Sequence, residues 1–267
     1  RFSPVEEADG CLEQYDVLRG QAAGTISTTA RTIKRLLMAE EQKGVLRNRR
    51  SGQFDIRNMS AIVRGTGTCY RKPWEKPSPK TLLCTLTDFS GSMMHSWASQ
   101  STIPPINLAM MGALAIEQAT AGTSVNTAMY GYTGYSPHVD LFAFKEGKQS
   151  SVLTRRRIGS YHNVDMNCTP TGEAMAALAM RMEDAEEDRK ILLVLTDGSA
   201  DDMSLCGEVS RILIKRGIEV VAIGICNDSV SQWAPVYHII HDITQLPQAL
   251  LATIDPRFAK KRMKAAA

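Results

Sequence analysis

The chain has 267 residues, of which 43% are hydrophobic and 22% are charged, and its formal net charge is +3. This composition is typical of a soluble globular protein, and the length suffices for one large domain or for one domain with an appendage. The longest apolar runs are only as long as a strand, which excludes a transmembrane helix. We therefore expect a protein that does not associate with a membrane.

Two further features bear on the location of the protein. The N-terminal stretch RFSPVEEADG is acidic and has no apolar core, so it is no secretory signal, and the missing initial Met suggests a part of a longer protein. The six cysteines form no C-x-x-C pair and lie at no zinc-finger spacing. Without a signal or a disulfide-like framework, we expect the reducing cytoplasm.

The first 79 residues are expected to form a helical and basic lead-in segment. Residues 5–19 and 28–43 are predicted helices, and the Pro-rich stretch KPWEKPSPK marks a boundary near residue 80. Residues 1–80 carry 15 Lys and Arg against 9 Asp and Glu, with the excess concentrated in residues 44–72. Such a stretch can contact nucleic acid or an acidic partner surface. We interpret it as a solvated connecting segment and expect no nucleic-acid binding.

From residue 81 onward, apolar runs of strand length alternate with segments of helical periodicity. The predicted strands are 81–88, 125–133, 139–145, 190–198, 218–226 and 236–243, and the predicted helices are 106–122, 171–188, 201–217 and 244–254. Strands 125–133 and 139–145 flank a short turn and should pair antiparallel. The remaining runs are too continuous for one-sided burial, which indicates a doubly wound α/β domain over residues 80–256, with a mostly parallel sheet between two layers of helices. A basic tail, residues 257–267, follows.

Two of the predicted strands end in an aspartate, Asp88 in LTDFSGS and Asp197 in LTDGSA. Because ligands bind outside the carboxyl ends of parallel strands, both acids should face the same crevice. Ser90 and Ser92 follow the first acid, and Thr169 in NCTPTGEAM lies in a loop that leads into a helix. A set of oxygen ligands without His or Cys suits a hard divalent cation such as Mg²⁺.

Simpler interpretations of these residues compete with the metal site. The group after Asp88 could cap the helix that follows, and Thr169 could be the N-cap of the helix that begins near residue 171. Asp201 and Asp202 are interpreted as helix caps. Thr171 is the alternative to Thr169 for the hydroxyl in the loop.

The pattern D-x-S-x-S after one strand, a Thr in a later loop and an Asp after a further strand resembles the von Willebrand factor type A domain. That resemblance implies a Rossmann-like fold with a metal-ion-dependent adhesion site, in which Asp88, Ser90, Ser92, Thr169 and Asp197 hold Mg²⁺, with Mn²⁺ or Ca²⁺ as possible substitutes. In the family the hydroxyls reach the metal directly and the acids typically act through water. Largely neutral ligands leave the cation under-compensated, so an Asp or Glu carboxylate of a partner protein completes the site.

The stretches RLLMAE, GQFDIRNMSAIV, LLCTLTDFSGSMM, RKILLVLTDGSADD and YHIIHDITQLPQALLATI, within residues 33–255, resemble the C-terminal part of CobT-type cobaltochelatase subunits. The resemblance implies an AAA+ ATPase of the MoxR/CobS type as partner, together with a large chelatase subunit that inserts cobalt into a corrin for cobalamin biosynthesis. CobT-type members are often altered at the Thr position, whereas Thr169 is present here, so a MoxR-partner protein with another substrate is an alternative.

The sequence predicts a subunit without its own catalytic site. It has no P-loop, because RGTGTCYRK lacks the G-K-[ST] ending, and DFSGS is no nucleophile elbow. A stand-alone adhesion or scaffold module is one alternative. A metal-dependent phosphatase with Asp88 as nucleophile is another, although such enzymes need a second carboxylate where this chain has Ser90.

Overall fold

The computed structural model of the chain describes residues 2–21, 23–24, 27–28, 30–31, 44–74, 80–94, 103–121, 123, 125–147, 149–241, 243–245, 248–250 and 252. The chain divides into two compact units. The larger unit is Arg1–Lys34 together with Pro79–Ala267, and the smaller unit is Arg35–Ser78. The domain limits predicted at residues 80 and 256 stay predictions, and the predicted tail, residues 257–267, lies outside the described residues.

The larger unit is built on one seven-stranded sheet. Its strands are β1 (Phe2–Pro4), β5 (Thr81–Asp88), β6 (Val125–Tyr135), β7 (His138–Lys145), β8 (Arg189–Thr196), β9 (Ile218–Ile225) and β10 (Tyr237–Ile240). Its α-helices are α1 (Cys11–Gln21), α4 (Pro105–Thr120), α5 (Ser151–Gly159), α6 (Thr171–Glu183) and α7 (Met203–Lys215). Short 3₁₀ turns are η2 (Gly91–Met94), η4 (Tyr161–Asn163), η5 (Ser229–Gln232) and η6 (Ile243–Gln245).

The strand order in this sheet is β1-β7-β6-β5-β8-β9-β10. All neighbours pair parallel except β6 and β7, which pair antiparallel as predicted. Strand β5 lies at the centre, with Asp88 opposite Tyr132 of β6 and Thr87 opposite Leu195 of β8. The carboxyl ends of β5 and β8 therefore meet at one edge of the sheet.

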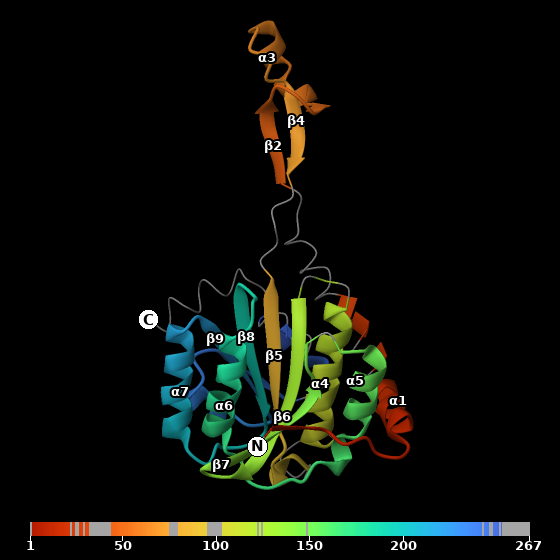
Figure 1. Cartoon of the computed structure of the whole chain (residues 1–267), viewed down its shortest axis with the longest axis vertical. Coiled ribbons are helices and arrows are strands. Elements are labelled where there is room, and N and C mark those ends of the chain that lie inside the picture. Colours follow the sequence, from red (N-terminus) through yellow and green to blue (C-terminus); the bar gives the residue numbers. More distant parts are fainter. Residues whose placement is uncertain are drawn as a thin grey trace. The chain divides into compact units, whose positions relative to one another are not determined.

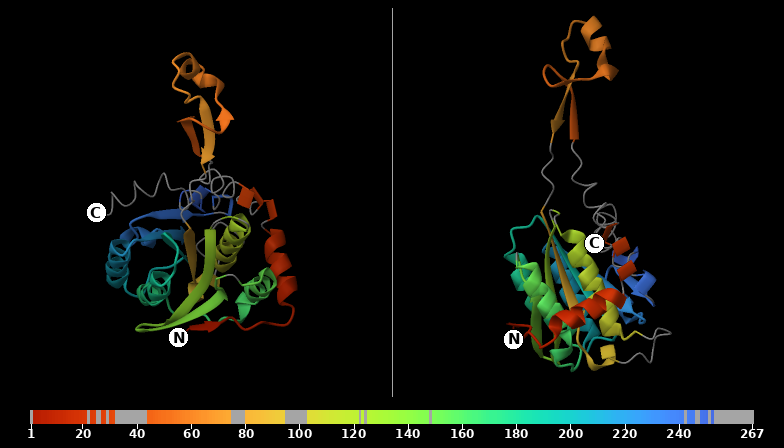
Figure 2. Two further views of the ribbon diagram at one scale, coloured as in Figure 1. Left: turned by 45° about the horizontal axis from the view of Figure 1, so that its top comes forward. Right: turned by 90° about the vertical axis from the view of Figure 1, so that its right-hand side faces the viewer.

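Helices cover both faces of the sheet (Figures 1 and 2): α6 and α7 pack on one face, and α4 and α5 on the other. This arrangement follows from the burial pattern of the central strands, since seven of the eight residues of β5 are buried and only Leu82 is intermediate. Strands covered by helices on both faces are predominantly apolar. The predicted doubly wound α/β fold is confirmed.

Local signals determine where several helices begin and end. Asp202 is the N-cap of α7 and accepts a hydrogen bond from the Leu205 amide at 2.9 Å, and Ser150 caps α5 in the same way through the Leu153 amide. Gly217, with φ +83°, follows the last turn of α7 in the left-handed conformation that glycine tolerates. Among the described residues, no helix combines the length and apolar character of a membrane span.

The start of the predicted lead-in belongs to the larger unit. β1 pairs parallel with β7 at the edge of the sheet, and α1 packs against α5 and α4. The helix predicted at residues 5–19 begins only at Cys11, because the chain first runs along β7. Of the helix predicted at 28–43, residues 28, 30 and 31 are helical, and 32–43 lie outside the described residues.

The smaller unit corrects the expectation that residues 44–72 are only a solvated connecting segment. Its strands β2 (Gly44–Arg49), β3 (Gln53–Phe54) and β4 (Tyr70–Trp74) form an antiparallel sheet in the order β2-β4-β3, with η1 (Ile56–Asn58) and α3 (Ser60–Val63) between β3 and β4. The chain turns at Gly52, where φ is +130° and a Cβ would lie 2.5 Å from the Arg71 carbonyl oxygen. Only glycine fits this close approach. The turn brings together strand segments whose sequences have no helical periodicity.

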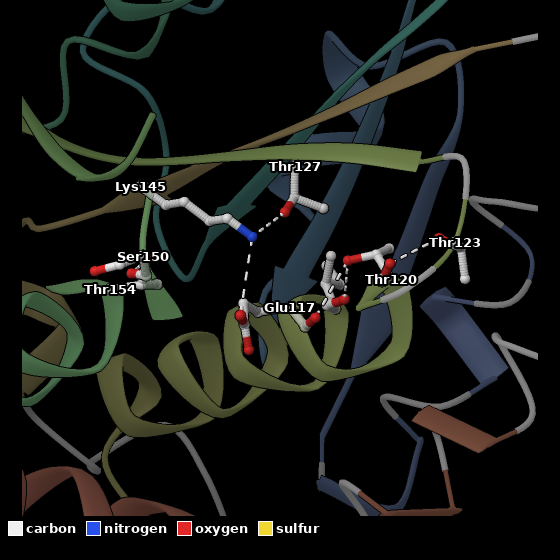
Figure 3. Close-up of polar contacts among 8 residues, drawn as sticks. Glu117, Thr120, Thr123, Thr127, Lys145, Ser150 and Thr154 are labelled. Atoms are coloured by element: carbon white, nitrogen blue, oxygen red, sulfur yellow. Dashed lines mark hydrogen bonds and ion pairs between the residues drawn. The ribbon is translucent and has the colours of Figure 1, made fainter. Parts of the chain in front are cut away.

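Polar contacts surround the C-terminal half of α4 and the neighbouring strands (Figure 3). Lys145 at the end of β7 donates a hydrogen bond to Thr127 Oγ1 at 2.7 Å, and its Nζ lies 3.9 Å from the Glu117 carboxylate of α4. Burial lowers the pKa of Lys145, and the nearby Glu117 carboxylate opposes that shift. In the last turn of α4, Thr120 donates to the Ile116 carbonyl at 2.8 Å. Of these contacts, the ion pair between Lys145 and Glu117 links α4 to β7.

Replacing Glu117 with glutamine is expected to lower the free energy of unfolding by about 1–3 kcal/mol, because the half-buried Lys145 charge then loses its counter-charge. Urea denaturation at neutral pH measures the change. Glu7→Gln is the matched control, since Glu7 pairs with Arg156 on the surface, and it should cost less than about 0.5 kcal/mol. Equal losses in the two variants would contradict a structural role for the α4 contact.

Candidate metal-binding site

Three of the five predicted ligands contact one another at the carboxyl edge of the sheet. The hydroxyl oxygens of Ser90 and Ser92 lie 3.0 Å apart, and Ser92 donates a hydrogen bond to Asp197 Oδ1 at 2.8 Å. Ser90 and Ser92 follow β5, whereas Asp197 follows β8, so residues 105 positions apart are brought together. Ser90 is almost fully buried, and Ser92 and Asp197 are partly accessible.

Asp88 lies behind these three residues and is fully buried. Its Oδ1 accepts a hydrogen bond from the Ser90 amide at 2.9 Å, and its Oδ2 accepts one from the Thr196 hydroxyl at 2.6 Å. Burial raises the pKa of Asp88 to about 7; the Asp197 charge adds to the shift, and the two hydrogen bonds oppose it. Burial also raises the pKa of Asp197. A cation beside the two carboxylates would favour their charged forms.

The loop that carries Thr169 is attached to both of these strand ends. The Gly91 amide donates to the Asn167 carbonyl at 3.0 Å, which joins the loop to the turn after β5. On the other side, the Thr169 amide donates to Asp201 Oδ1 at 3.2 Å, and the Asp201 amide donates to the Thr169 carbonyl at 3.0 Å. Thr169 is thereby held between the loops that carry Ser90 and Asp197.

The contacts of the loop bear on the capping interpretations of its residues. Thr169 does not cap α6, whose N-cap residue is Pro170 and makes no side-chain cap hydrogen bond. Thr171 is fully buried, and its hydroxyl lies 2.8 Å from the Tyr132 hydroxyl, so it is engaged in the core. The interpretation of Asp202 as a helix cap is confirmed, but that of Asp201 is wrong, since Asp201 holds the backbone of Thr169.

Buried aromatic packing holds the turn after β5 in place. Phe89, between Asp88 and Ser90, is fully buried and stacks on Phe144 of β7 at a ring-centroid distance of 5.6 Å. A Cβ on Gly131 of β6 would lie 2.6 Å from the Phe89 ring, so only glycine leaves room for it. Because alternate residues of an extended segment point to opposite sides, anchoring Phe89 inward directs its polar neighbours to the sheet edge.

Sequence reasoning missed three supporting residues, Thr196, Asn167 and Thr133. Thr196 holds Asp88, and the Thr133 hydroxyl accepts a hydrogen bond from the Asn167 amide at 2.8 Å. The Thr of LTD recurs before both acids, as Thr87 and Thr196, and that repeat was a usable signal for Thr196. Asn167 and Thr133 carry no local signal, because their roles depend on contacts between distant segments.

The chemistry of the donors fits a hard divalent cation. The assembled groups are two carboxylates and neutral hydroxyls, all of them oxygen donors. Within the described part of the chain, no cluster of three or more His, Cys, Asp or Glu side chains could hold a metal by itself. A cation at this edge would therefore need oxygen donors in addition to the two acids.

The family model of the von Willebrand factor type A domain matches residues 83–255, well over half of the chain. The chain belongs to this family. The matched range begins within β5 and contains all five residues of the candidate site. No curated protein sequence matches this chain significantly.

Solved structures share the von Willebrand fold at low sequence identity. BatB from Bacteroides thetaiotaomicron has a TM-score of 0.53 at 15% identity, over 67% of this chain and 99% of that one. An aerotolerance-related membrane protein from Bacteroides fragilis has a TM-score of 0.50 at 16% identity, over 66% and 98%. The pilus adhesin SpaC from Lactobacillus rhamnosus GG has a TM-score of 0.50 at 12% identity, over 72% and 31%. At these sequence identities, the similarities show a shared fold alone.

Proposed function

We propose that Asp88, Ser90, Ser92, Thr169 and Asp197 bind Mg²⁺, with Mn²⁺ or Ca²⁺ as substitutes, and that the bound cation engages a carboxylate of a partner protein. The observation that carries the proposal is the contact series from Ser90 through Ser92 to Asp197. It gathers oxygen donors from two strand ends at a partly accessible edge. A cation held largely by neutral hydroxyls keeps an affinity for an anionic ligand from outside.

Partner binding is favoured over catalysis by the surroundings of Asp88. A phosphatase nucleophile needs an accessible carboxylate oxygen, whereas Asp88 is fully buried and both of its oxygens accept hydrogen bonds from the chain. Ser90 also stands where the second carboxylate of such an enzyme would be needed. The phosphatase alternative is therefore the weaker one.

As the partner we propose an AAA+ ATPase of the MoxR/CobS type in the cytoplasm, with this chain as the CobT-type subunit of a cobaltochelatase. The support is the resemblance of the lead-in and closing stretches to CobT-type subunits, together with the membership of the von Willebrand family. In this assembly the ATPase would supply ATP hydrolysis, and a large chelatase subunit would insert cobalt. A MoxR partner with another substrate and a stand-alone adhesion or scaffold module are the alternatives.

Co-purification tests this proposal. The full chain, co-expressed with the MoxR/CobS-type ATPase of the same organism, should retain the ATPase on an affinity column in about 5 mM MgCl₂. The complex should be lost in EDTA and in the Asp88→Ala variant. Retention in EDTA would exclude the metal-bridged contact. Mg²⁺ binding without any ATPase retention would favour the adhesion or scaffold alternative.

A further inference from the structure

Most of the described apolar side chains of the smaller unit (Arg35–Ser78) are exposed. Among the described side chains of residues 49–72, the only buried apolar one is Cys69. Five others are exposed, including Ile56 at 74% and Val63 at 89%, and together we call them the apolar cap: Phe54, Ile56, Met59, Ile62 and Val63. Contiguous exposed apolar residues mark interaction sites, because exposure to water has no structural benefit.

The apolar cap is held in a defined conformation. It occupies the end of β3, the turn η1 and the short helix α3, at one end of the β2–β4 sheet (Figure 1). The buried Asp55 accepts a hydrogen bond from the Arg57 amide at 3.2 Å and so caps η1, while its own amide donates to the Cys69 carbonyl at 2.9 Å. Phe54 packs edge-on against Tyr70. A surface held in this way loses little conformational entropy when it binds.

The charge around the apolar cap is strongly positive. Asp55 is the one acid in residues 49–72, and it is buried. The exposed cations in the same range are Arg49, Arg50, Arg57, Arg64, Arg71 and Lys72. Arginine is enriched in protein interfaces and pairs bidentately with carboxylates, whereas lysine is depleted there. Together with the exposed apolar side chains, these arginines suit an acidic protein surface as the binding partner.

We propose that the smaller unit is a docking module whose apolar cap enters an apolar groove on a partner protein, while the surrounding arginines pair with acidic residues along that groove. Lysine binds an anionic membrane as well as arginine does, and such membranes are usually bound by a longer amphipathic helix. A nucleic acid would need the cations but not five exposed apolar side chains. None of the five candidate metal ligands belongs to the docking module, so its binding should not depend on Mg²⁺.

Site-specific photocrosslinking in cells tests the docking module in the full chain. A benzophenone amino acid replaces Ile62, and in a matched control it replaces Val152, an aliphatic residue on α5 that is 51% exposed. The Ile62 position, but not Val152, should give an adduct with another protein, in which mass spectrometry locates the crosslink beside a segment rich in Asp and Glu. Adducts only with lipid, nucleic acid or a second copy of this chain, or none, would overturn the proposal.

The identified partner is then titrated with the purified full chain by fluorescence anisotropy. Arg57→Glu combined with Arg64→Glu should weaken binding about tenfold or more, and Arg57→Lys combined with Arg64→Lys should weaken it less. Unchanged circular dichroism and thermal midpoints establish that these variants fold. Binding should persist in EDTA and in Asp197→Ala. Loss of binding in EDTA would assign the contact to the metal site and overturn the docking module.

Discussion

If the proposed site binds Mg²⁺, replacing Asp197 with alanine is expected to lower the Mg²⁺ affinity of the chain about 100-fold, because the variant loses one of the two carboxylates of the proposed site and the acceptor that orients Ser92. Isothermal titration calorimetry with MgCl₂ measures the affinity. The fold should not suffer, since removal of Asp197 also removes the charge that disfavours ionisation of the buried Asp88. In the absence of metal, the variant should unfold at the same or a higher urea concentration.

Asp202→Asn is the matched control for this experiment. Asp202 lies five residues further along the same loop and caps α7, and asparagine is an equally good N-cap. The control should change the Mg²⁺ affinity by less than about twofold, which reflects only the weaker field at that distance. An Asp197→Ala variant that binds Mg²⁺ like the natural chain would exclude Asp197 from the site.

Replacing Gly159 with alanine should have the largest effect on stability. A Cβ at this position, at the end of α5, would lie 1.7 Å from the Cys11 carbonyl oxygen and 3.2 Å from the Tyr15 amide nitrogen of α1. Both are backbone atoms, so no side-chain rotation relieves the clash and the two helices have to separate. We expect a loss of about 3 kcal/mol or more in the free energy of unfolding, measured by urea denaturation.

Hydrogen exchange tests the cause of that loss. Separation of α1 from α5 should accelerate exchange of the amides of residues 11–21, while the central strands β5 and β8 keep their protection. Gly20→Ala is the control, because nothing lies within 4 Å of that Cβ and the residue is inside α1. It should raise stability by about 0.5–1 kcal/mol. Equal stability of the two variants would show that α1 does not pack as described.

The predictions from sequence were strongest for the central strands. The strand predicted at 81–88 has those bounds in the structure, and those at 190–198 and 218–226 differ by two residues or fewer at each end. Their apolar runs reflect burial on both faces, which is a local property of the sequence. Helix α5 was missed, because its segment SVLTRRRIG presents few apolar residues and its burial comes from packing on α1 and β7.

The candidate site likewise has a part that the sequence predicts and a part that depends on tertiary contacts. The residues alone predict that Asp88 and Asp197 come at the ends of buried strands and that two hydroxyls follow Asp88 at alternate positions. Strand burial is a local pattern of the sequence, and the carboxyl ends of parallel strands lie at the same edge of a sheet. The engagement of the Thr171 hydroxyl in the core could not be predicted in this way. It depends on a hydrogen bond between Thr171 and Tyr132, which lie 39 positions apart.

The sequence by itself determined the fold class and the acids and hydroxyls of one sheet edge, since hydrophobic periodicity is local and dictates which side chains are buried. Tertiary structure alone decided that β1 joins the larger sheet, that β2, β3 and β4 pair in a sheet of their own, and that Asp201 holds the Thr169 loop. Each of these depends on hydrogen bonds between segments far apart in the chain, whose free energy exists only once the strands and loops are brought together.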